Sequence, residues 1–378
     1  MPTPRSGESH EEMRARVNAR DRAARRQWAA TQQTVQLDAN GTMQSRSITY
    51  APEREPYKPL PNAMLARRSA LVDAENNVLQ QWLIEKPEDR ARYEAWEAYA
   101  RALAAGLPVI EPIPPPSGTS DSLMAFYPVG DHHLGMLSWK QETGASYDID
   151  IGERLLAGAI DHLTQATPAC QQAAVVFLGD FMHYDSFVAA TPTNNNPLDA
   201  DGRFPKMASA AMRVMMRVIE AAARRHGHVH VVIEIGNHDL TSSIWLQEAL
   251  SVIYQNNPRI AVDRSPKHFH YIEFGRNLIG IHHGHGPKMA ELPGIMAHDR
   301  AEAWGRTTHR FWWTGHIHTQ RAYDYPGCSV ESFRILPPTD AWAANEGYRS
   351  KRDMKAVMLH KEFGEVARYT VSPEMLDA

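Results

Sequence analysis

Five short motifs in the C-terminal two-thirds of the chain collect side chains that bind metal ions and transfer protons. Each follows a strand-like stretch, and in chain order they are Asp131-His132-His133, Gly179-Asp180, Gly236-Asn237-His238-Asp239, His282-His283-Gly284-His285 and Gly315-His316-Ile317-His318. Carboxylate, carboxamide and imidazole groups in this mixture suit phosphoester hydrolysis by two divalent cations, which polarise a phosphate oxygen and ionise a water near neutral pH. One motif would be weak evidence, but five in order predict a metal-dependent phosphoesterase.

The spacing of the first two motifs indicates which side chains act as ligands. Asp131 and His133 are two residues apart, so at an extended strand end both side chains face the same way and suit one metal. His132 then points to the opposite face, where we expect it to pack. Asp180 follows a buried strand and a glycine that lets the backbone approach the cations closely, so its carboxylate is predicted to bridge them.

The Gly236–Asp239 motif supplies a ligand and an acid. The side-chain oxygen of Asn237 suits a hard divalent ion, which leaves His238 free to donate a proton. We expect the adjacent Asp239 to fix the orientation of that imidazole and keep it protonated. His238 and Asp239 are therefore the predicted catalytic residues.

The last two motifs contribute imidazoles. His283 is the expected ligand of its motif, with His282 on the opposite face of the strand and His285 near the substrate. His316 and His318 are two residues apart and can each reach a different cation. Nine of the 19 histidines lie in or beside the five motifs, a concentration that core packing does not explain. The predicted metal ligands are Asp131, His133, Asp180, Asn237, His283, His316 and His318.

The elements that must position these motifs alternate between strands and helices. Apolar stretches predict strands at 122–129, 173–178, 229–235, 269–274, 277–282, 310–314, 356–360 and 366–371. Helical periodicity covers 149–163, 206–225 and 244–254. Functional groups at the C-terminal ends of strands indicate an α/β fold with its active site along one edge of a sheet. The loop at 191–201 either borders a substrate cleft or is an inert insertion.

Proline-rich stretches at 51–61 and 108–116 predict linkers that divide the chain. Residues 1–61 are interpreted as a basic, partly disordered arm, 62–118 as a helical segment with a second linker, and 119–378 as the catalytic domain. Six arginines against three acidic residues in 11–28 suit either nucleic-acid contact or a solvated arm or oligomerisation helix. Trp96, Tyr99, Leu103 and Leu107 follow helical spacing. No internal repeat is evident.

Composition limits the classes of function. The 378 residues are enough for one sizeable catalytic domain and a smaller unit, and the net charge of −4 gives no global attraction to polyanions. Two cysteines indicate neither a disulfide framework nor a thiolate metal site, which favours the cytoplasm. The sequence contains neither a membrane-spanning run nor a secretory signal, so no membrane partner is expected.

The motifs resemble the calcineurin-like metallophosphoesterase superfamily, whose order is D-x-H, G-D, G-N-H-D or G-N-H-E, a strand-ending histidine and G-H-x-H. The resemblance covers about residues 121–375 and implies a four-layer α/β/β/α sandwich, here preceded by a small helical N-terminal region. It implies that one cation is held by Asp131, His133, Asp180 and His318, and the other by Asp180, Asn237, His283 and His316. A water ionised by the cations would attack phosphorus while His238 protonates the leaving oxygen.

Flanking residues indicate a branch of this superfamily. Ile235 stands where protein phosphatases carry arginine, and His238 stands where lipid-precursor pyrophosphatases favour arginine. Asp131-His132-His133-Leu134-Gly135 and Gly179-Asp180-Phe181-Met182-His183 are most similar to the exonuclease subunits of double-strand-break repair complexes. The chain lacks the partner-binding extension of those subunits, which favours a stand-alone or phage-type relative.

Three classes of function compete. A nuclease that cleaves DNA or another nucleic acid is favoured by the first two motifs and opposed by the lack of net positive charge. The alternative is a phosphatase or phosphodiesterase for small nucleotides. A non-catalytic binding protein is disfavoured because every ligand type is present. Oxygen and nitrogen ligands without sulfur favour manganese, iron or zinc, and two manganese ions are expected. Protein partners and oligomeric state are not indicated.

Overall fold

The structure is a computed structural model, and it describes residues 28–37, 43–52, 63–72, 78–87 and 113–376. The chain forms two compact units, Met1–Ala102 and Leu103–Ala378. The described part of the first unit contains strands β1 to β4, and the second unit contains the remaining elements.

The described part of the N-terminal unit is a four-stranded sheet in the order β1-β2-β4-β3. Its strands are β1 (Trp28–Leu37), β2 (Met43–Pro52), β3 (Ala63–Val72) and β4 (Val78–Pro87). The helical prediction for this region is therefore wrong at 63–72 and 78–87, because antiparallel pairing of the two segments overrides their local helix propensity. The apolar stripe from Trp96 to Leu107 lies outside the described residues.

The two hairpins of this sheet repeat along the chain. β3 begins 35 residues after β1 (63 − 28), and β4 begins 35 residues after β2 (78 − 43). The hairpins also close in the same register, with Leu37 opposite Met43 in one and Val72 opposite Val78 in the other. The expectation of no internal repeat is wrong, because strands tolerate wide sequence variation as long as their pairing and register are kept.

Two mixed sheets form the centre of the C-terminal unit. The larger has the order β15-β14-β5-β6-β7-β8, and the smaller has the order β12-β13-β11-β10-β9. The larger sheet consists of β5 (Ser120–Val129), β6 (Cys170–Phe177), β7 (His228–Ile233), β8 (Ile260–Val262), β14 (Met354–His360) and β15 (Gly364–Val371). The smaller consists of β9 (His270–Phe274), β10 (Asn277–Ile281), β11 (His309–Thr314), β12 (Arg321–Tyr325) and β13 (Cys328–Ser332).

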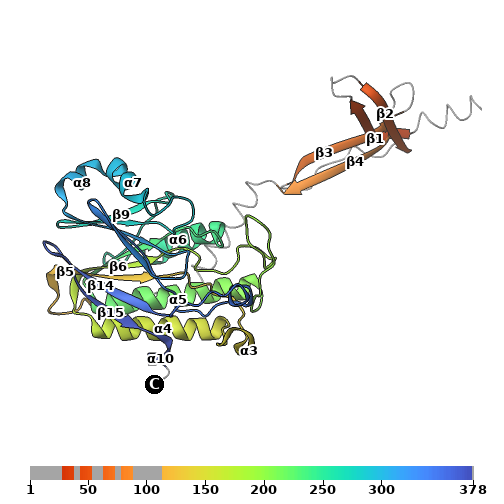
Figure 1. The fold of residues 1–378 in the computed structure, drawn as a ribbon. Helices are drawn as coiled ribbons and strands as arrows, with labels where there is room; N and C mark the ends of the chain where they lie inside the picture. The colour runs from red at the N-terminus through yellow and green to blue at the C-terminus, as the bar shows by residue number, and fades with distance from the viewer. Residues whose placement is uncertain (1–27, 38–42, 53–62, 73–77, 88–112, 377–378) are drawn as a thin grey trace, which may run out of the picture. The chain divides into compact units, whose positions relative to one another are not determined.

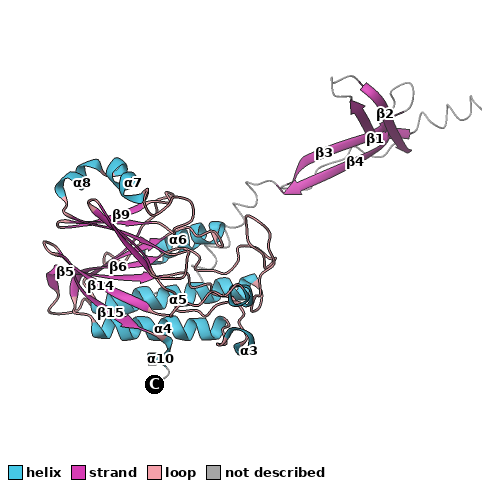
Figure 2. Ribbon diagram, viewed as in Figure 1, coloured by secondary structure: helices cyan, strands magenta, loops and turns pink. Residues whose placement is uncertain are grey.

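Helices cover the outer face of each sheet, which produces four layers (Figures 1 and 2). The larger sheet is covered by α4 (Ile149–Ala166), α5 (Phe204–Arg225) and α6 (Leu240–Tyr254), and the smaller by α7 (Leu292–Asp299) and α8 (Ala301–Arg306). Side chains alternate along β6, so Val175 and Phe177 pack against the helices while Ala174 and Val176 face the second sheet. The predicted α/β/β/α sandwich is confirmed.

The strands that carry the motifs end in the same region of the molecule. β5, β6 and β7 are parallel neighbours, as are β10 and β11. Each of the five motifs begins within three residues after one of these strands. Because parallel strands end on the same side of a sheet, the fold brings the five motifs together.

Short helices complete the second unit: α3 (Lys140–Thr143), α9 (Ala341–Asn345) and α10 (Pro373–Leu376). In the part of the chain that the structure describes, no helix has the length and apolar character needed to cross a bilayer.

Candidate active site

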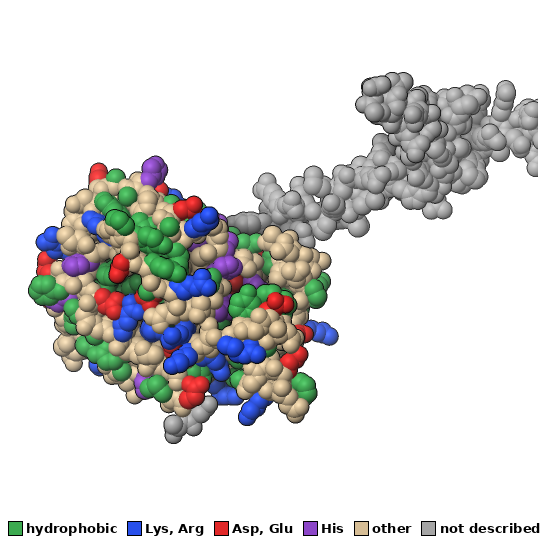
Figure 3. All heavy atoms as spheres, in the orientation of Figure 1, with side chains coloured by type: hydrophobic (Ala, Val, Ile, Leu, Met, Phe, Trp, Pro, Cys, Tyr) green, Lys and Arg blue, Asp and Glu red, His purple; other side chains and the backbone are tan. Residues whose placement is uncertain are grey.

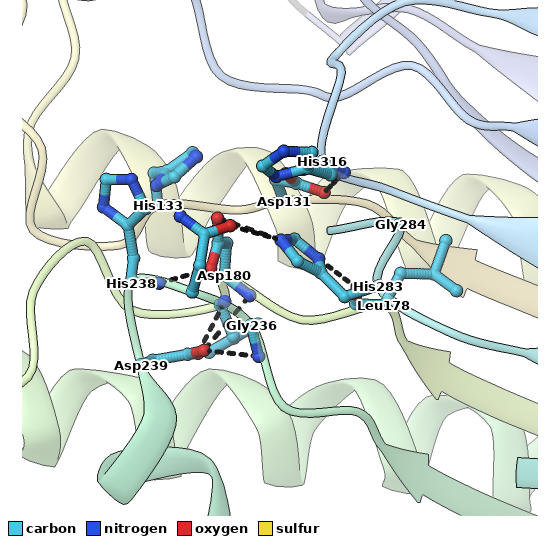
Figure 4. Close-up of polar contacts among 12 residues, drawn as sticks. Asp131, His133, Leu178, Asp180, Gly236, His238, Asp239, His283, Gly284 and His316 are labelled. Atoms are coloured by element: carbon cyan, nitrogen blue, oxygen red, sulfur yellow. Dashed lines mark hydrogen bonds and ion pairs between the residues drawn. The ribbon is translucent and has the colours of Figure 1, made fainter. Parts of the chain in front are cut away.

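The predicted metal ligands gather around Asp180 (Figure 4). Two sets of three side chains could each hold a metal ion, because the donor atoms within each set lie within 4.8 Å of one another. One set comes from Asp131, His133 and His318, and the other from Asp180, His283 and His316. All of these side chains follow the C-terminal ends of strands, as the sequence predicts.

In the first set, the donor atoms of the two imidazoles and the carboxylate lie close together. Nε2 of His318 lies 3.0 Å from Oδ2 of Asp131 and 3.1 Å from Nε2 of His133. The Asp131 carboxylate is fully buried, and both of its oxygens accept from the backbone N–H of His316, at 3.0 and 2.9 Å. The backbone of the fifth motif therefore holds the predicted ligand of the first motif in place.

In the second set, His283 is oriented by the backbone. Its Nδ1–H donates to the carbonyl oxygen of Leu178 at 2.7 Å, which directs Nε2 toward the centre. Nε2 lies 3.2 Å from Oδ2 of Asp180 and 3.0 Å from Oδ1 of Asn237. The structure thus brings Asn237, the seventh predicted ligand, to the same position as the carboxylate that we expect to bridge the cations.

The backbone at several predicted ligands adopts an unfavourable conformation. His133, Asp180, His316 and His318 have φ angles of 41°, 48°, 68° and 53°, and they are four of the five non-glycine residues with positive φ in the described part of the chain. A left-handed conformation at a non-glycine residue costs about 1–3 kcal/mol and is retained where function requires it. Because four of the five such residues are predicted ligands, we infer that contacts with the surrounding fold maintain this unfavourable backbone conformation at the site.

Two motif glycines are required by close approach. A Cβ atom on Gly236 would lie 2.1 Å from both N and Oδ1 of Asp180, and one on Gly315 would lie 2.2 Å from Oδ1 of Asp131. Both glycines therefore let the strands' ends pack directly against the carboxylates.

Asp239 has a different role from the predicted one. Its carboxylate does not contact the His238 imidazole but accepts from the backbone N–H groups of Gly236, Asp180, Phe181 and Met182, at 2.8 to 3.2 Å. The expectation that Asp239 orients the imidazole is thus wrong, because the carboxylate lies below the motif and holds two motif backbones together (Figure 4). Asp239 is a positioning residue.

The imidazole of His238 is oriented instead by a backbone carbonyl. Its Nδ1–H donates to the oxygen of His183 at 2.8 Å. The side chain is half-buried at the rim of the centre, with its ring centroid 4.8 Å from that of His133. This arrangement leaves Nε2 as the nitrogen that can exchange a proton with a substrate.

Sequence reasoning did not assign a role to His183. The ring is buried, its Nδ1 lies 3.4 Å from Nδ1 of His133, and it forms a third possible donor set with His133 and His238. Burial, and then proximity to His238, lowers the pKa of His183 to about 3, so the ring is neutral. Its position three residues after Asp180 was the available signal.

The remaining motif histidines occupy supporting positions. His132 is buried and packs against Tyr147 and Phe181, as predicted. His282 is buried, accepts from the backbone N–H of Gly284 at 2.9 Å, and stacks with His285 at a centroid distance of 5.6 Å. His282 therefore supports the turn that follows His283.

The electrostatics of the centre favour a bound cation. Burial lowers the pKa of His283, but the carboxylates of Asp180 and Asp131 outweigh burial and raise that pKa to about 10. Burial opposes ionisation of Asp180, but His283 outweighs it and holds the pKa of this carboxyl well below its usual range. The pKa of His133 is driven well below 6.5 by burial and by His238, which keeps it in the neutral form that binds metals.

The donor set fits divalent cations. Nε2 of His183 and Nδ1 of His285 are buried at the edge of the centre without a hydrogen-bond partner among the described residues. Carboxylate and carboxamide oxygens with imidazole nitrogens, and no thiolate, suit manganese, iron or zinc. The geometry therefore supports the binding of divalent metal ions here.

A second polar cluster lies beside the centre. His270 is buried, with Nδ1 2.8 Å from Oδ2 of Asp263 and Nε2 3.2 Å from Oε2 of the buried Glu234. Burial lowers the pKa of His270, but the two carboxylates outweigh it and raise the pKa to about 9. Burial raises the pKa of Glu234 to about 7. An imidazolium ion that contacts the Asp263 carboxylate through Nδ1 and the Glu234 side chain through Nε2 therefore stabilises this part of the fold.

We expect His270→Ala to lower the free energy of unfolding by about 3–5 kcal/mol, because Asp263 and the buried Glu234 would both lose this cationic partner. Since folding raises the pKa of His270, its stabilising contribution is complete below pH 6.5 and is lost as the pH rises through about 9. Denaturant unfolding of both proteins across this range measures the effect. A difference in stability that does not shrink with rising pH would contradict the charged form of His270.

Sequence comparisons show neither a family model nor a curated protein that matches this chain. Structure comparison finds an archaeal phosphodiesterase with 14% identity, a TM-score of 0.34, and coverage of 66% of this chain and 100% of the other. A predicted phosphoesterase from Streptococcus pneumoniae has 10% identity, a TM-score of 0.28, and coverage of 67% and 100%. Zinc-bound Vps29 from Entamoeba histolytica has 13% identity, a TM-score of 0.27, and coverage of 66% and 99%. Similarity at this level assigns no activity to this chain.

Proposed function

We propose that this chain is a metal-dependent phosphoesterase that hydrolyses phosphodiester bonds in nucleic acid. The observation that carries the proposal is the pair of donor sets that meet around the buried Asp180 carboxylate. A half-buried imidazole, that of His238, lies at the rim of the same centre. Two adjacent cation sites with one proton donor are what hydrolysis of a phosphoester requires.

The side chains divide into metal-holding and proton-transferring groups. Asp131, His133 and His318 would hold one divalent cation, His283, His316 and Asn237 the other, and Asp180 would contact both. When bound, such cations polarise the phosphate and lower the pKa of the attacking water. Manganese is the proposed metal, since oxygen and nitrogen donors without sulfur suit it.

His238 is proposed as the general acid. With Nδ1–H held by the carbonyl oxygen of His183, the imidazolium form presents Nε2–H to the leaving oxygen of the substrate. Asp239 acts indirectly, since its four backbone contacts fix the loop on which His238 lies.

The similarity of the first two motifs to those of repair exonucleases supports nucleic acid as the substrate. We expect the purified protein to hydrolyse bis-p-nitrophenyl phosphate faster than p-nitrophenyl phosphate, and to shorten end-labelled DNA, with manganese but not with chelator. Each substrate is assayed under both conditions, and single- and double-stranded DNA are compared. If the small esters are hydrolysed but DNA is left intact, the nuclease proposal is rejected in favour of a phosphoesterase that acts on small nucleotides. Inactivity on every ester with manganese, zinc and iron would reject the phosphoesterase itself.

A further inference from the structure

Three loops are joined directly beside the candidate active site. Residues 134–139 follow His133, and the backbone N–H of Leu137 donates to the oxygen of Asp199, which ties them to the loop after His183. On the other side, Oγ of Ser138 donates to the oxygen of Thr339 at 2.6 Å, which ties them to the segment that contains α9. These three loops therefore form a continuous border next to the predicted ligand His133.

This border exposes an unusual share of large apolar side chains. Twelve are exposed in residues 113–376, and six of them lie in the three loops: Leu137, Trp139, Phe187, Val188, Trp342 and Tyr348. The four aromatic side chains, here called the aromatic rim, have exposed fractions of 60% for Trp139, 81% for Phe187, 65% for Trp342 and 56% for Tyr348. Exposed apolar side chains that cluster mark a binding surface more often than isolated ones do.

The geometry of the rim suits flat ligands. The rings of Trp342 and Tyr348 lie 5.8 Å apart between centroids and are inclined by only 34°. The two ring planes are therefore inclined only modestly to each other, and exposed aromatic rings of this kind can stack with nucleobases.

Basic side chains are interleaved with the aromatic ones. The exposed Lys140 follows Trp139, and the exposed Arg349 and Lys351 follow Tyr348. Among residues 113–376, the Arg349 guanidinium donates only to backbone carbonyl oxygens, those of Ala344 and Tyr348, so no carboxylate there neutralises its positive charge. Figure 3 shows hydrophobic and basic side chains side by side over the part of the surface that contains α3 and α9.

The same three loops also carry acidic side chains, which weaken their electrostatic attraction for phosphates. Glu142 and Glu346 are exposed there, so the charge of the border is mixed. Phosphate attraction alone would be weak on such a surface, whereas stacking on aromatic rings is independent of net charge. Stacking requires exposed base faces, which an intact duplex does not offer.

We propose that the aromatic rim binds an unpaired segment of a nucleic-acid substrate by base stacking and leads it to the metal centre. The inference rests on the proposed function and specifies its substrate as single-stranded, or as a duplex with an unpaired end. The exposed lysine and arginine side chains contact the phosphates of the same segment.

The test measures binding separately from catalysis. The full chain is titrated, with chelator present, into a short fluorescein-labelled oligothymidylate and into a blunt duplex. The variant is Trp342→Ala/Tyr348→Ala. The matched control is Phe363→Ala, because Phe363 is also an exposed aromatic (71%) but lies in the β14–β15 turn, at the end of the sheet opposite to Asp131. Hydrolysis of bis-p-nitrophenyl phosphate with manganese is measured for all proteins.

We expect the double variant to bind oligothymidylate about tenfold or more weakly than wild type, with Phe363→Ala unchanged. Bis-p-nitrophenyl phosphate hydrolysis should be the same in all three. If the affinity of the double variant is unchanged, or if its affinity for the blunt duplex falls equally, the proposal that the aromatic rim binds unpaired nucleic acid is rejected. Neither outcome affects the proposed phosphoesterase function. If the wild-type protein does not hydrolyse bis-p-nitrophenyl phosphate, the proposed function is rejected. The binding data then still decide whether the aromatic rim binds single strands.

Discussion

Replacing His238 with alanine should lower the rate of DNA cleavage by about 10²- to 10⁴-fold, the usual contribution of a positioned general acid, while metal content stays unchanged. The imidazole contacts the backbone oxygen of His183 through Nδ1 and is not a member of the two donor sets centred on Asp131 and Asp180. Removing it therefore takes away a proton donor without removing a ligand of either set. Turnover and metal content, measured on the same preparation, check both halves of the prediction.

The leaving group distinguishes an acid from a residue that merely shapes the site. A DNA sugar oxygen is a poor leaving group and needs a proton, whereas p-nitrophenolate leaves readily without one. The loss for His238→Ala should therefore be much smaller with bis-p-nitrophenyl phosphate than with DNA. His298→Ala is the matched control, because His298 lies on α7 with its side chain 89% exposed. Equal losses with both substrates would contradict the role of general acid.

That the predicted ligands would gather at one end of the sheets was predictable, because each motif directly follows a strand and contains its polar side chains at close spacing. Asp131 and His133, and likewise His316 and His318, are two residues apart, and each pair reaches the centre. The left-handed φ of His133, His316 and His318 was not predictable, because it is imposed by contacts between motifs such as the one from the His316 N–H to Asp131.

Predictions based on residues adjacent in the sequence failed where contacts between distant residues determine side-chain orientation or secondary structure. Asp239 adjoins His238 in the chain, yet its carboxylate is turned toward the amides that follow Asp180. The orienting group for His238 is a carbonyl 55 residues away, and no side-chain pattern marks a backbone oxygen. In the N-terminal unit, residues 63–72 have good helix formers, but pairing with 78–87 makes both segments strands.

Replacing Asp180 with asparagine should lower the affinity for divalent metal by more than about 100-fold. Loss of an outer hydrogen-bond partner of a ligand costs about 10- to 100-fold, and a carboxylate shared by two cations contributes more than such a partner. Asparagine keeps the shape of the side chain and an oxygen that can accept from the His238 N–H, which Oδ1 of Asp180 accepts at 2.7 Å. The fold should therefore survive, and the effect can be assigned to the lost negative charge.

Metal content by mass spectrometry and manganese titration by calorimetry measure this loss, and circular dichroism verifies the fold. The matched control is Asp150→Asn, an exposed carboxylate in the first turn of α4. We expect the control to bind metal like wild type and the Asp180 variant to lose both metal and activity. Full loading of Asp180→Asn with two cations would show that the carboxylate does not bridge them. Loss of one cation only would assign Asp180 to a single site and leave the other set, Asp131 with His133 and His318, as an independent site.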